Sequence, residues 1–372
     1  MENNDTAKKI KVGFPHLGNY WVGFREIASM LDAEIIMPPP ITKKTIEIGA
    51  RQSPDTACVP YKYTIGNFVE CLEKGANVLI QAGGTSCRYA YYGEVQEAAL
   101  KKMGYDFIMI RFSANRAGII KTLLKFKKMN PKLGYGRMVK SFLLAYKKFE
   151  AIEKVEDFIR KNIGFEIKRG SLEKIFDQFL KELDGVHEFG LIRRMKEKYL
   201  GECLKIETNK PANPLRVGMI GEFYVTIESF SNFFIEKELG KRGIEVHRFI
   251  GLTHELQNLI FSRRRTNKYL KIAKPYLRHH IGAHGTETVG IALELIEQGF
   301  DGLIHVKPFG CVPEVSSMSM LHKISKDFKV PILYFSFDAQ TSETGVKTRI
   351  EAFYDMLKMK KTKKYGKETS SS

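Results

Sequence analysis

The stretch TIGNFVECLEKGANVLIQAGGTSC at residues 64–87 decides the fold, because a related stretch recurs further along the chain. It aligns without gaps on TVGIALELIEQGFDGLIHVKPFGC at residues 288–311, with a constant offset of 224. Both stretches have the order of a helix, a glycine-ended turn, an apolar strand and a cysteine. Gly75 and Gly299 stand where a helix C-terminus favours glycine. The shared order indicates an internal duplication.

Each copy of this stretch is preceded by its own strand and helix. Short apolar runs at residues 10–14 and 215–220 are typical of strands, and helical stripes follow them at 20–31 and 229–241. A second apolar run comes after each helix, and strand–helix–strand order implies parallel pairing. We therefore predict an α/β protein with two Rossmann-like parallel-sheet domains related by the repeat, with a helical insertion between them.

The predicted parts of the chain follow from these patterns. They are a Rossmann-like domain with Cys58 and Cys87 (1–115), a basic helical insertion (116–213), a Rossmann-like domain with Cys311 (214–357) and a disordered basic tail (358–372). The insertion has helical periodicity with many Lys and Glu residues. The tail is predicted to be disordered because apolar periodicity stops at Leu357.

The composition of the 372 residues is that of a globular protein, with 43% hydrophobic and 27% charged residues. No uncharged apolar run reaches the length of about 20 residues that spans a bilayer. The first residues lack the apolar core of a secretory signal. We therefore expect a cytoplasmic protein without a membrane partner.

The charge is strongly basic, with 60 Lys and Arg residues against 42 Asp and Glu residues and a formal net charge of +18. The excess lies in three segments, at residues 116–149, 256–286 and 358–372. Such segments attract nucleic acid, anionic membranes, acidic proteins or phosphate-rich ligands, and they also occur as ordinary solvated faces. The charge alone leaves these alternatives open.

The five cysteines are too few for a secreted disulfide scaffold, so each is considered for metal or redox chemistry. Cys58 stands before a predicted helix, where a thiolate is stabilised, and Cys87 and Cys311 follow equivalent strands of the repeat. Thiolates that converge on an interdomain cleft would suit an iron–sulfur cluster. The alternative is that each cysteine is a small buried hydrophobe. We interpret Cys71 and Cys203 in that way.

Other polar residues allow two interpretations each. His280 and His284 have metal-ligand spacing, but the glycines around them favour a loop. In that loop Arg278, His279 and His280 could instead meet phosphate. The polar stretch at residues 336–353 either caps the following helix or orients a ligand. Tyrosines at 89–92 are expected to wall a ligand site beside Cys87. The chain has no phosphate-binding P-loop, dinucleotide fingerprint or α/β-hydrolase nucleophile motif.

Four segments carry a family resemblance: ACVPYKYTIGNFVECLEKGAN, AGGTSCRYAYYGEVQ, HVKPFGCVPE and SFDAQTSETGVKTRIEAF. They resemble the acyl-CoA dehydratase activase-related proteins of the 2-hydroxyglutaryl-CoA dehydratase superfamily, which are also described as CoA-substrate-specific activase-like iron–sulfur proteins. The resemblance covers most of residues 10–112 and 215–357. It implies a 4Fe–4S cluster held by Cys58, Cys87 and Cys311. It also implies that the site is lined by Asp338, Gln340, Thr341 and Arg349.

The resemblance implies a function in low-potential electron transfer. Such a protein accepts one electron from an ATP-dependent activase of the actin/Hsp70-like class and delivers it to a bound substrate, expected to be an acyl-CoA thioester. The electron forms a ketyl radical and permits loss of a hydroxyl group. The chain would then be a lyase or a low-potential reductase component, working with the activase and with a related dehydratase-like subunit or a second copy of itself.

The chain departs from the family pattern in three respects. Thr85 and Ser86 stand where Gly-Pro is frequent, five cysteines cannot supply the six ligands of an enlarged cluster, and no actin-like phosphate loop is present. The last point favours an electron acceptor over the ATPase itself. The alternatives are a non-catalytic iron–sulfur maturation, electron-transfer or sensing protein and, placed last because nucleic-acid motifs are lacking, a cluster-free nucleic-acid-binding protein.

Overall fold

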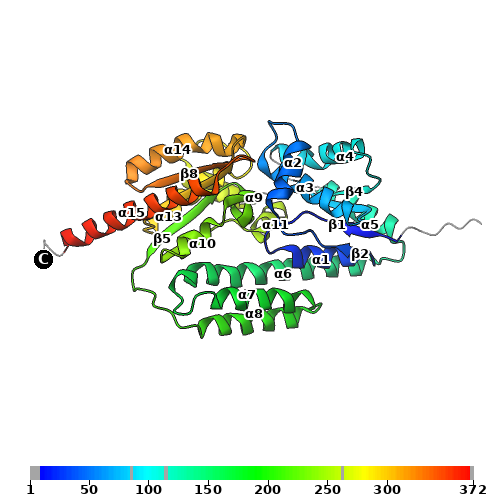
Figure 1. Ribbon diagram of the computed structural model, residues 1–372, viewed down its shortest axis with the longest axis horizontal. Helices are drawn as coiled ribbons and strands as arrows, with labels where there is room; N and C mark the ends of the chain where they lie inside the picture. Colours follow the sequence, from blue (N-terminus) through cyan, green and yellow to red (C-terminus); the bar gives the residue numbers. More distant parts are fainter. Residues whose placement is uncertain (1–8, 84–86, 113–115, 261–263, 369–372) are drawn as a thin grey trace, which may run out of the picture. The chain divides into compact units, whose positions relative to one another are not determined.

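The fold consists of two four-stranded sheets with helices, seen in a computed structural model that describes residues 9–83, 87–112, 116–260 and 264–368 (Figure 1). Every strand pairing within the two sheets is parallel. The predicted α/β class with two Rossmann-like parallel sheets is therefore confirmed. The chain divides into two compact units, a first unit of residues 1–57 and 61–146 and a second unit of residues 58–60 and 147–372.

The first unit contains a sheet of order β2-β1-β3-β4. Its strands are β1 (Lys11–Gly13), β2 (Glu34–Ile36), β3 (Val78–Ala82) and β4 (Ile108–Phe112). Its helices are α1 (Trp21–Ser29), α2 (Lys43–Arg51), α3 (Val59–Glu73), the 3-10 turn η1 (Arg88–Tyr91), α4 (Tyr92–Lys102), α5 (Arg116–Met129) and the first part of α6 (Tyr135–Asn162).

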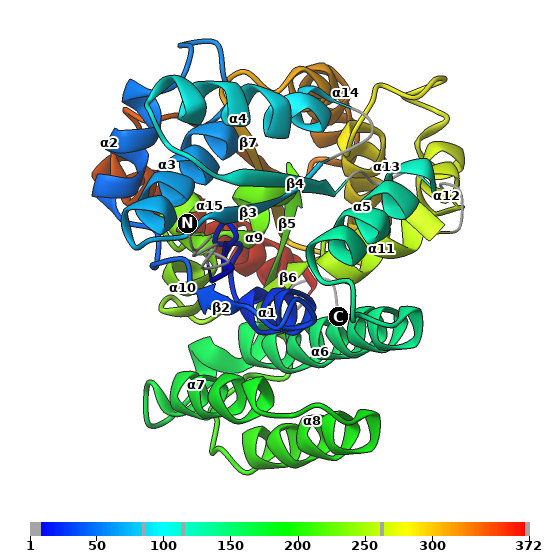
Figure 2. The ribbon, with the colours of Figure 1, turned by 90° about the vertical axis from the view of Figure 1, so that its right-hand side faces the viewer.

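The second unit contains a sheet of order β6-β5-β7-β8. Its strands are β5 (Leu215–Gly221), β6 (Ile244–Arg248), β7 (Gly302–Pro308) and β8 (Ile332–Phe337). The helical elements, besides the rest of α6, are η2 (Ile163–Phe165), α7 (Ser171–Asp184), α8 (Phe189–Leu204), α9 (Phe223–Ile227), η3 (Ser229–Asn232), α10 (Ile235–Gly240), α11 (Leu252–Ile260), α12 (Arg264–Ala273), α13 (Gly285–Glu297), α14 (Val312–Phe328) and α15 (Glu343–Glu368). Helices α7 and α8 lie side by side (Figure 2). None of the helices in the described part of the chain combines the length and apolar character needed to cross a bilayer.

The duplication is visible in the backbone as well as in the sequence. Both sheets place the first strand between the second and the third, and both third strands follow a helix that ends at a left-handed glycine. The φ angle is 90° at Gly75 and 75° at Gly299, a conformation that side chains other than glycine rarely adopt. The next residue in each turn donates its N–H to a carbonyl five residues earlier, at 3.0 Å for Ala76 and 3.1 Å for Phe300.

The predicted insertion at residues 116–213 is helical, but the two units divide it. In the first unit, Phe126, Leu133 and Met138 are buried in the same core as Val12 and Ile110 of the sheet. From residue 147 onward the segment belongs to the second unit. The apolar faces of α5 and early α6 are therefore part of an existing core, which the helical periodicity alone did not reveal.

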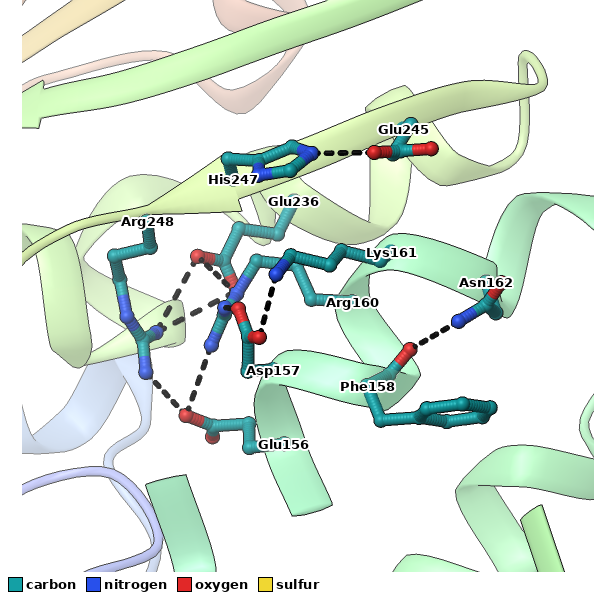
Figure 3. Close-up of polar contacts among 10 residues, drawn as sticks. All are labelled: Glu156, Asp157, Phe158, Arg160, Lys161, Asn162, Glu236, Glu245, His247 and Arg248. Carbon is teal, nitrogen blue, oxygen red and sulfur yellow. Dashed lines mark hydrogen bonds and ion pairs between the residues drawn. The ribbon is translucent and has the colours of Figure 1, made fainter. Parts of the chain in front are cut away.

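A network of ion pairs joins the end of α6 to β6 and α10 in the second unit (Figure 3). The side chains of Arg160 and Arg248 are only 4% and 3% exposed. Both guanidinium groups contact the carboxylates of Glu156 and Glu236, and Arg160 also pairs with Asp157 at 3.1 Å. Each buried cation thus has more than one anionic partner, which offsets the cost of removing it from water.

The predicted disorder of the basic tail is wrong for residues 358–368, because α15 continues to Glu368. Lysine is a good helix former, and lengthening an existing helix avoids the cost of starting a new one. Lys361 also contacts the body of the second unit, pairing with Asp301 at 3.3 Å and donating to the Pro214 carbonyl at 2.7 Å. Residues 369–372 lie outside the described part of the chain.

Candidate functional site

The five cysteines fall into two groups by exposure. Cys87 is exposed and Cys58 and Cys311 are half-buried, whereas Cys71 and Cys203 are buried inside α3 and α8. Burial raises the pKa of Cys71 to about 12 and that of Cys203 to about 11, so both thiols stay protonated at neutral pH. The interpretation of these two cysteines as core residues is confirmed.

Each of the three more accessible cysteines stands directly before a helical element. Cys58 precedes α3, Cys87 is the residue before η1, and Cys311 is the residue before α14. Cys87 and Cys311 follow β3 and β7, which are equivalent strands of the two sheets. Gly84, Thr85 and Ser86, which precede Cys87, lie outside the described residues.

Cys58 belongs with the second unit, the unit that contains Cys311. Burial raises the pKa of the Cys311 thiol, with Glu222, Glu314 and Cys58 among the nearby groups that raise it further. Among the described residues, no three Cys, His, Asp or Glu side chains are arranged to hold a metal ion. The three-cysteine ligand set therefore stays a prediction, although its donors are thiols of the type that such a cluster uses.

The second sheet has its topological switch point between β5 and β7, where open α/β sheets commonly bind ligands. Strand β5 ends at Gly221 with a φ of 130°, and a Cβ at this position would lie 1.9 Å from the Val306 carbonyl oxygen. Only glycine permits this approach. The N–H of Glu222 then donates to the same oxygen at 2.9 Å. Glu222 is thereby fixed beside the C-terminal end of β7.

Two ionisable groups near this switch point have shifted pKa values. Burial raises the pKa of Glu222, whose carboxylate also accepts hydrogen bonds from two backbone N–H groups of α9. His284 stands before α13 and pairs with Glu255 at 3.0 Å. Burial alone would lower the pKa of His284, but the carboxylates of Glu255, Glu287 and Glu222 outweigh this effect and raise it to about 10. His284 is therefore an imidazolium at neutral pH.

A buried polar network joins β7 to the helices α13 and α14 in the second unit, next in sequence to Cys311. Glu314 accepts hydrogen bonds from the Thr288 hydroxyl at 3.0 Å and the Ser317 hydroxyl at 3.2 Å, and it pairs with His305 Nε2 at 2.8 Å. All four side chains are at most 1% exposed. They come from α13, β7 and α14, so the network joins both helices to the strand that leads to the cysteine.

Lys307, near the end of β7, is a further buried cation. It is 4% exposed, and within the described residues no ion pair or side-chain hydrogen bond involves it. Burial lowers its pKa, and the nearby Cys311 and Glu314 partly oppose that effect. Perturbed ionisable groups of this kind cluster at functional sites. Sequence reasoning missed Lys307, Glu222 and Glu255, because the surroundings of these side chains depend on packing between distant segments.

Three of the residues that the resemblance placed around the site, Asp338, Gln340 and Thr341, follow the carboxyl end of β8, and Arg349 lies in α15. The Asp338 carboxylate accepts hydrogen bonds from the Gln340 N–H at 2.9 Å and the Thr341 hydroxyl at 3.0 Å. Arg349 donates to the Tyr334 carbonyl at 2.7 Å and lies over the Phe335 ring. The Asp338 contacts close the turn between β8 and α15, and the Arg349 contacts attach α15 to β8. A role of the stretch in capping α15 stays a prediction. A role in lining a ligand site stays a prediction.

Of the tyrosines at residues 89–92 that were predicted to wall a ligand site, Tyr92 lines a small hollow in the first unit. This hollow has a volume of about 150 Å³ and is lined by Tyr61, Arg88, Tyr92, Val95, Pro54, Thr56 and Ala57. The rings of Tyr61 and Tyr92 meet edge to face at 4.9 Å, whereas Tyr91 is 70% exposed.

The loop predicted around His280 and His284 is confirmed, and the two histidines have different surroundings. His280 is exposed, as is the neighbouring His279. His284 instead pairs with Glu255 and stacks on Phe223, with ring centroids 5.7 Å apart. A phosphate partner for His279 and His280 stays a prediction.

Comparison with known proteins adds no family assignment. No protein-family model matches the chain, and no curated protein matches it. The resemblance to dehydratase-related proteins thus rests on the sequence motifs alone.

Proposed function

We propose that this chain is a 4Fe–4S protein resembling the components of 2-hydroxyacyl-CoA dehydratases, with Cys58, Cys87 and Cys311 as the cluster ligands. The observation that carries the proposal is the division of the cysteines by exposure and position. Three are exposed or half-buried and stand before helical elements, while two are buried within helices. A chain that used cysteine only as a core residue would have no reason for this division.

The positions before helices suit anionic ligands. Backbone N–H groups at a helix start are free of intrahelical partners and favour a thiolate. At Cys311 burial and the carboxylates of Glu222 and Glu314 oppose this effect in the iron-free chain, and a bound metal would have to supply the compensating positive charge. When bound, a 4Fe–4S cluster with three protein thiolates supplies low-potential one-electron chemistry and leaves one iron without a cysteine ligand. The chain itself holds the thiolates and supplies the charged groups around Cys311.

In the proposed role, the protein accepts an electron from an ATP-dependent activase and delivers it to an acyl-CoA thioester. The basic segments give partners for the phosphates of CoA or for an acidic face of the activase. Lys271, Lys274 and Arg278 support this role, because they are exposed and no ion pair among the described residues involves them. The acyl-CoA substrate and the activase are inferred from the family resemblance.

The ligand assignment is tested with Cys58→Ser, Cys87→Ser and Cys311→Ser, each purified and reconstituted without oxygen. Each variant is expected to lose most of its iron and acid-labile sulfide. Cys71→Ala and Cys203→Ala are the matched controls, and they are expected to keep iron per folded chain. Full iron content in any of the three serine variants would contradict the assignment.

The electron-transfer role needs a second test, with an ATP-hydrolysing activase and EPR of the mixture. ATP-dependent appearance of a reduced-cluster signal supports the dehydratase-like role. A cluster that forms but is never reduced in this way would instead favour the non-catalytic maturation or sensing role.

A further inference from the structure

We propose that Lys307 binds an oxyanion, the phosphate or carboxylate group of a small ligand, at the switch point of the second sheet. The inference stands apart from the iron–sulfur proposal, because it uses none of the three cysteines. It rests on the burial of Lys307, on the lack of an internal partner and on its place in the sheet.

Lys307 differs from the other deeply buried cations of the second unit. Arg160 and Arg248 each contact at least two carboxylates, and Lys148 donates to the Asp184 carbonyl at 3.3 Å. Lys307 is 4% exposed, yet among the described residues no acceptor contacts it. A buried ammonium without a partner is costly, so its retention points to an anion that the protein chain does not supply.

The carboxylate that acts on the charge of Lys307 is Glu314, and its oxygens already have other partners. They accept hydrogen bonds from the Thr288 and Ser317 hydroxyls and pair with His305. None of these hydrogen bonds comes from the lysine, so its positive charge is available to a ligand.

The place of Lys307 in the sheet also fits ligand binding. It pairs in register with Ser336 of β8 on one side, and on the other side β5 ends at Gly221, next to Val306. It therefore lies where the three strands finish, at the edge where open α/β sheets bind ligands. Because the side chain is only 4% exposed, the proposed ligand must be small, since a membrane surface or a folded partner is too large to contact it.

The test measures thermal unfolding of the full-length protein, prepared without iron, in phosphate, acetate or chloride at equal ionic strength. Phosphate or acetate is expected to raise the Tm of the wild-type protein by about 3 °C or more above chloride, since a ligand bound only by the folded state stabilises it. Phosphate acting alone identifies a phosphate ligand, and acetate acting alone identifies a carboxylate.

Lys307→Met removes the charge and keeps the length of the side chain. This variant is expected to have a higher Tm than the wild type in chloride and to lose the response to the anion. Lys326→Met, at an exposed position of α14, is the matched control and should keep the response. Lys307→Gln serves as the second variant if Lys307→Met does not fold. A wild-type protein whose Tm is the same in phosphate, acetate and chloride would overturn the proposal. So would a Lys307 variant whose Tm still rises in the anion that stabilises the wild type.

Discussion

The two sheets have the same strand order, yet equivalent polar residues at and before their third strands have partners of different charge. In the first unit Thr64 accepts a hydrogen bond from the neutral Gln96 at 2.6 Å, and the neutral Gln81 is buried in β3. In the second unit the residue equivalent to Gln81 is His305, and it pairs with a carboxylate, Glu314. The duplication thus preserved the backbone plan, while a histidine–carboxylate pair at the third strand occurs in the second unit and a neutral amide stands at the equivalent strand position of the first.

The largest expected difference between the units comes from truncating these networks. Glu314→Ala leaves three buried groups without their shared acceptor and is expected to lower the free energy of unfolding by about 3–5 kcal/mol. Gln96→Ala removes a neutral amide and is expected to cost about 1–3 kcal/mol. Urea denaturation of both variants measures the difference. Equal losses would show that the two networks contribute alike.

The second difference is in pH dependence, through His284. Its folded pKa of about 10 lies above the ordinary value of 6.5, so its ion pairs contribute stability that is complete below about pH 6.5 and is lost as the pH rises through about 10. The residue that stands 224 positions earlier in the chain is Pro60, which has no ionisable side chain. Relative to His284→Gln, the wild type should lose about 2–3 kcal/mol of unfolding free energy over this range. Parallel stability curves for the two proteins would refute the assignment.

The helix-ending glycines should instead behave alike in both units. Gly75→Ala and Gly299→Ala each place a side chain at positive φ without a backbone overlap, so each is expected to cost about 1–2 kcal/mol. Gly201→Ala, within α8 and with open space around it, is the matched control and is expected to be neutral or slightly stabilising. Clearly unequal costs at Gly75 and Gly299, measured by urea denaturation, would argue against equivalent turns.

The smallest expected effect concerns thiol reactivity in iron-free protein. Cys87, being exposed, should be alkylated faster than its repeat equivalent Cys311, because burial together with Glu222 raises the pKa of the Cys311 thiol and lowers its thiolate fraction. Cys71 and Cys203 should react only after unfolding. Mass spectrometry of timed alkylation at mildly alkaline pH measures all five rates. Faster reaction of Cys311 would contradict this order.

Much of the fold was predictable because its signals are local. The repeat, the turns at Gly75 and Gly299 and the burial of Cys71 all follow from short-range patterns. The arrangement of charged groups near the switch point of the second sheet was not predictable from the sequence. The contacts of Glu222, Lys307 and His284 come from segments that are far apart in the chain. The extent of α15 was missed for a related reason, because the contacts of Lys361 lie outside its own segment.

The most direct test of the central proposal is the iron and acid-labile sulfide content of the protein purified without oxygen, with EPR after reduction. The proposal predicts about four irons and four sulfides per chain and a reduced-cluster signal. Protein that binds no iron after anaerobic reconstitution would contradict it and leave two parallel-sheet units with cysteines that serve another purpose.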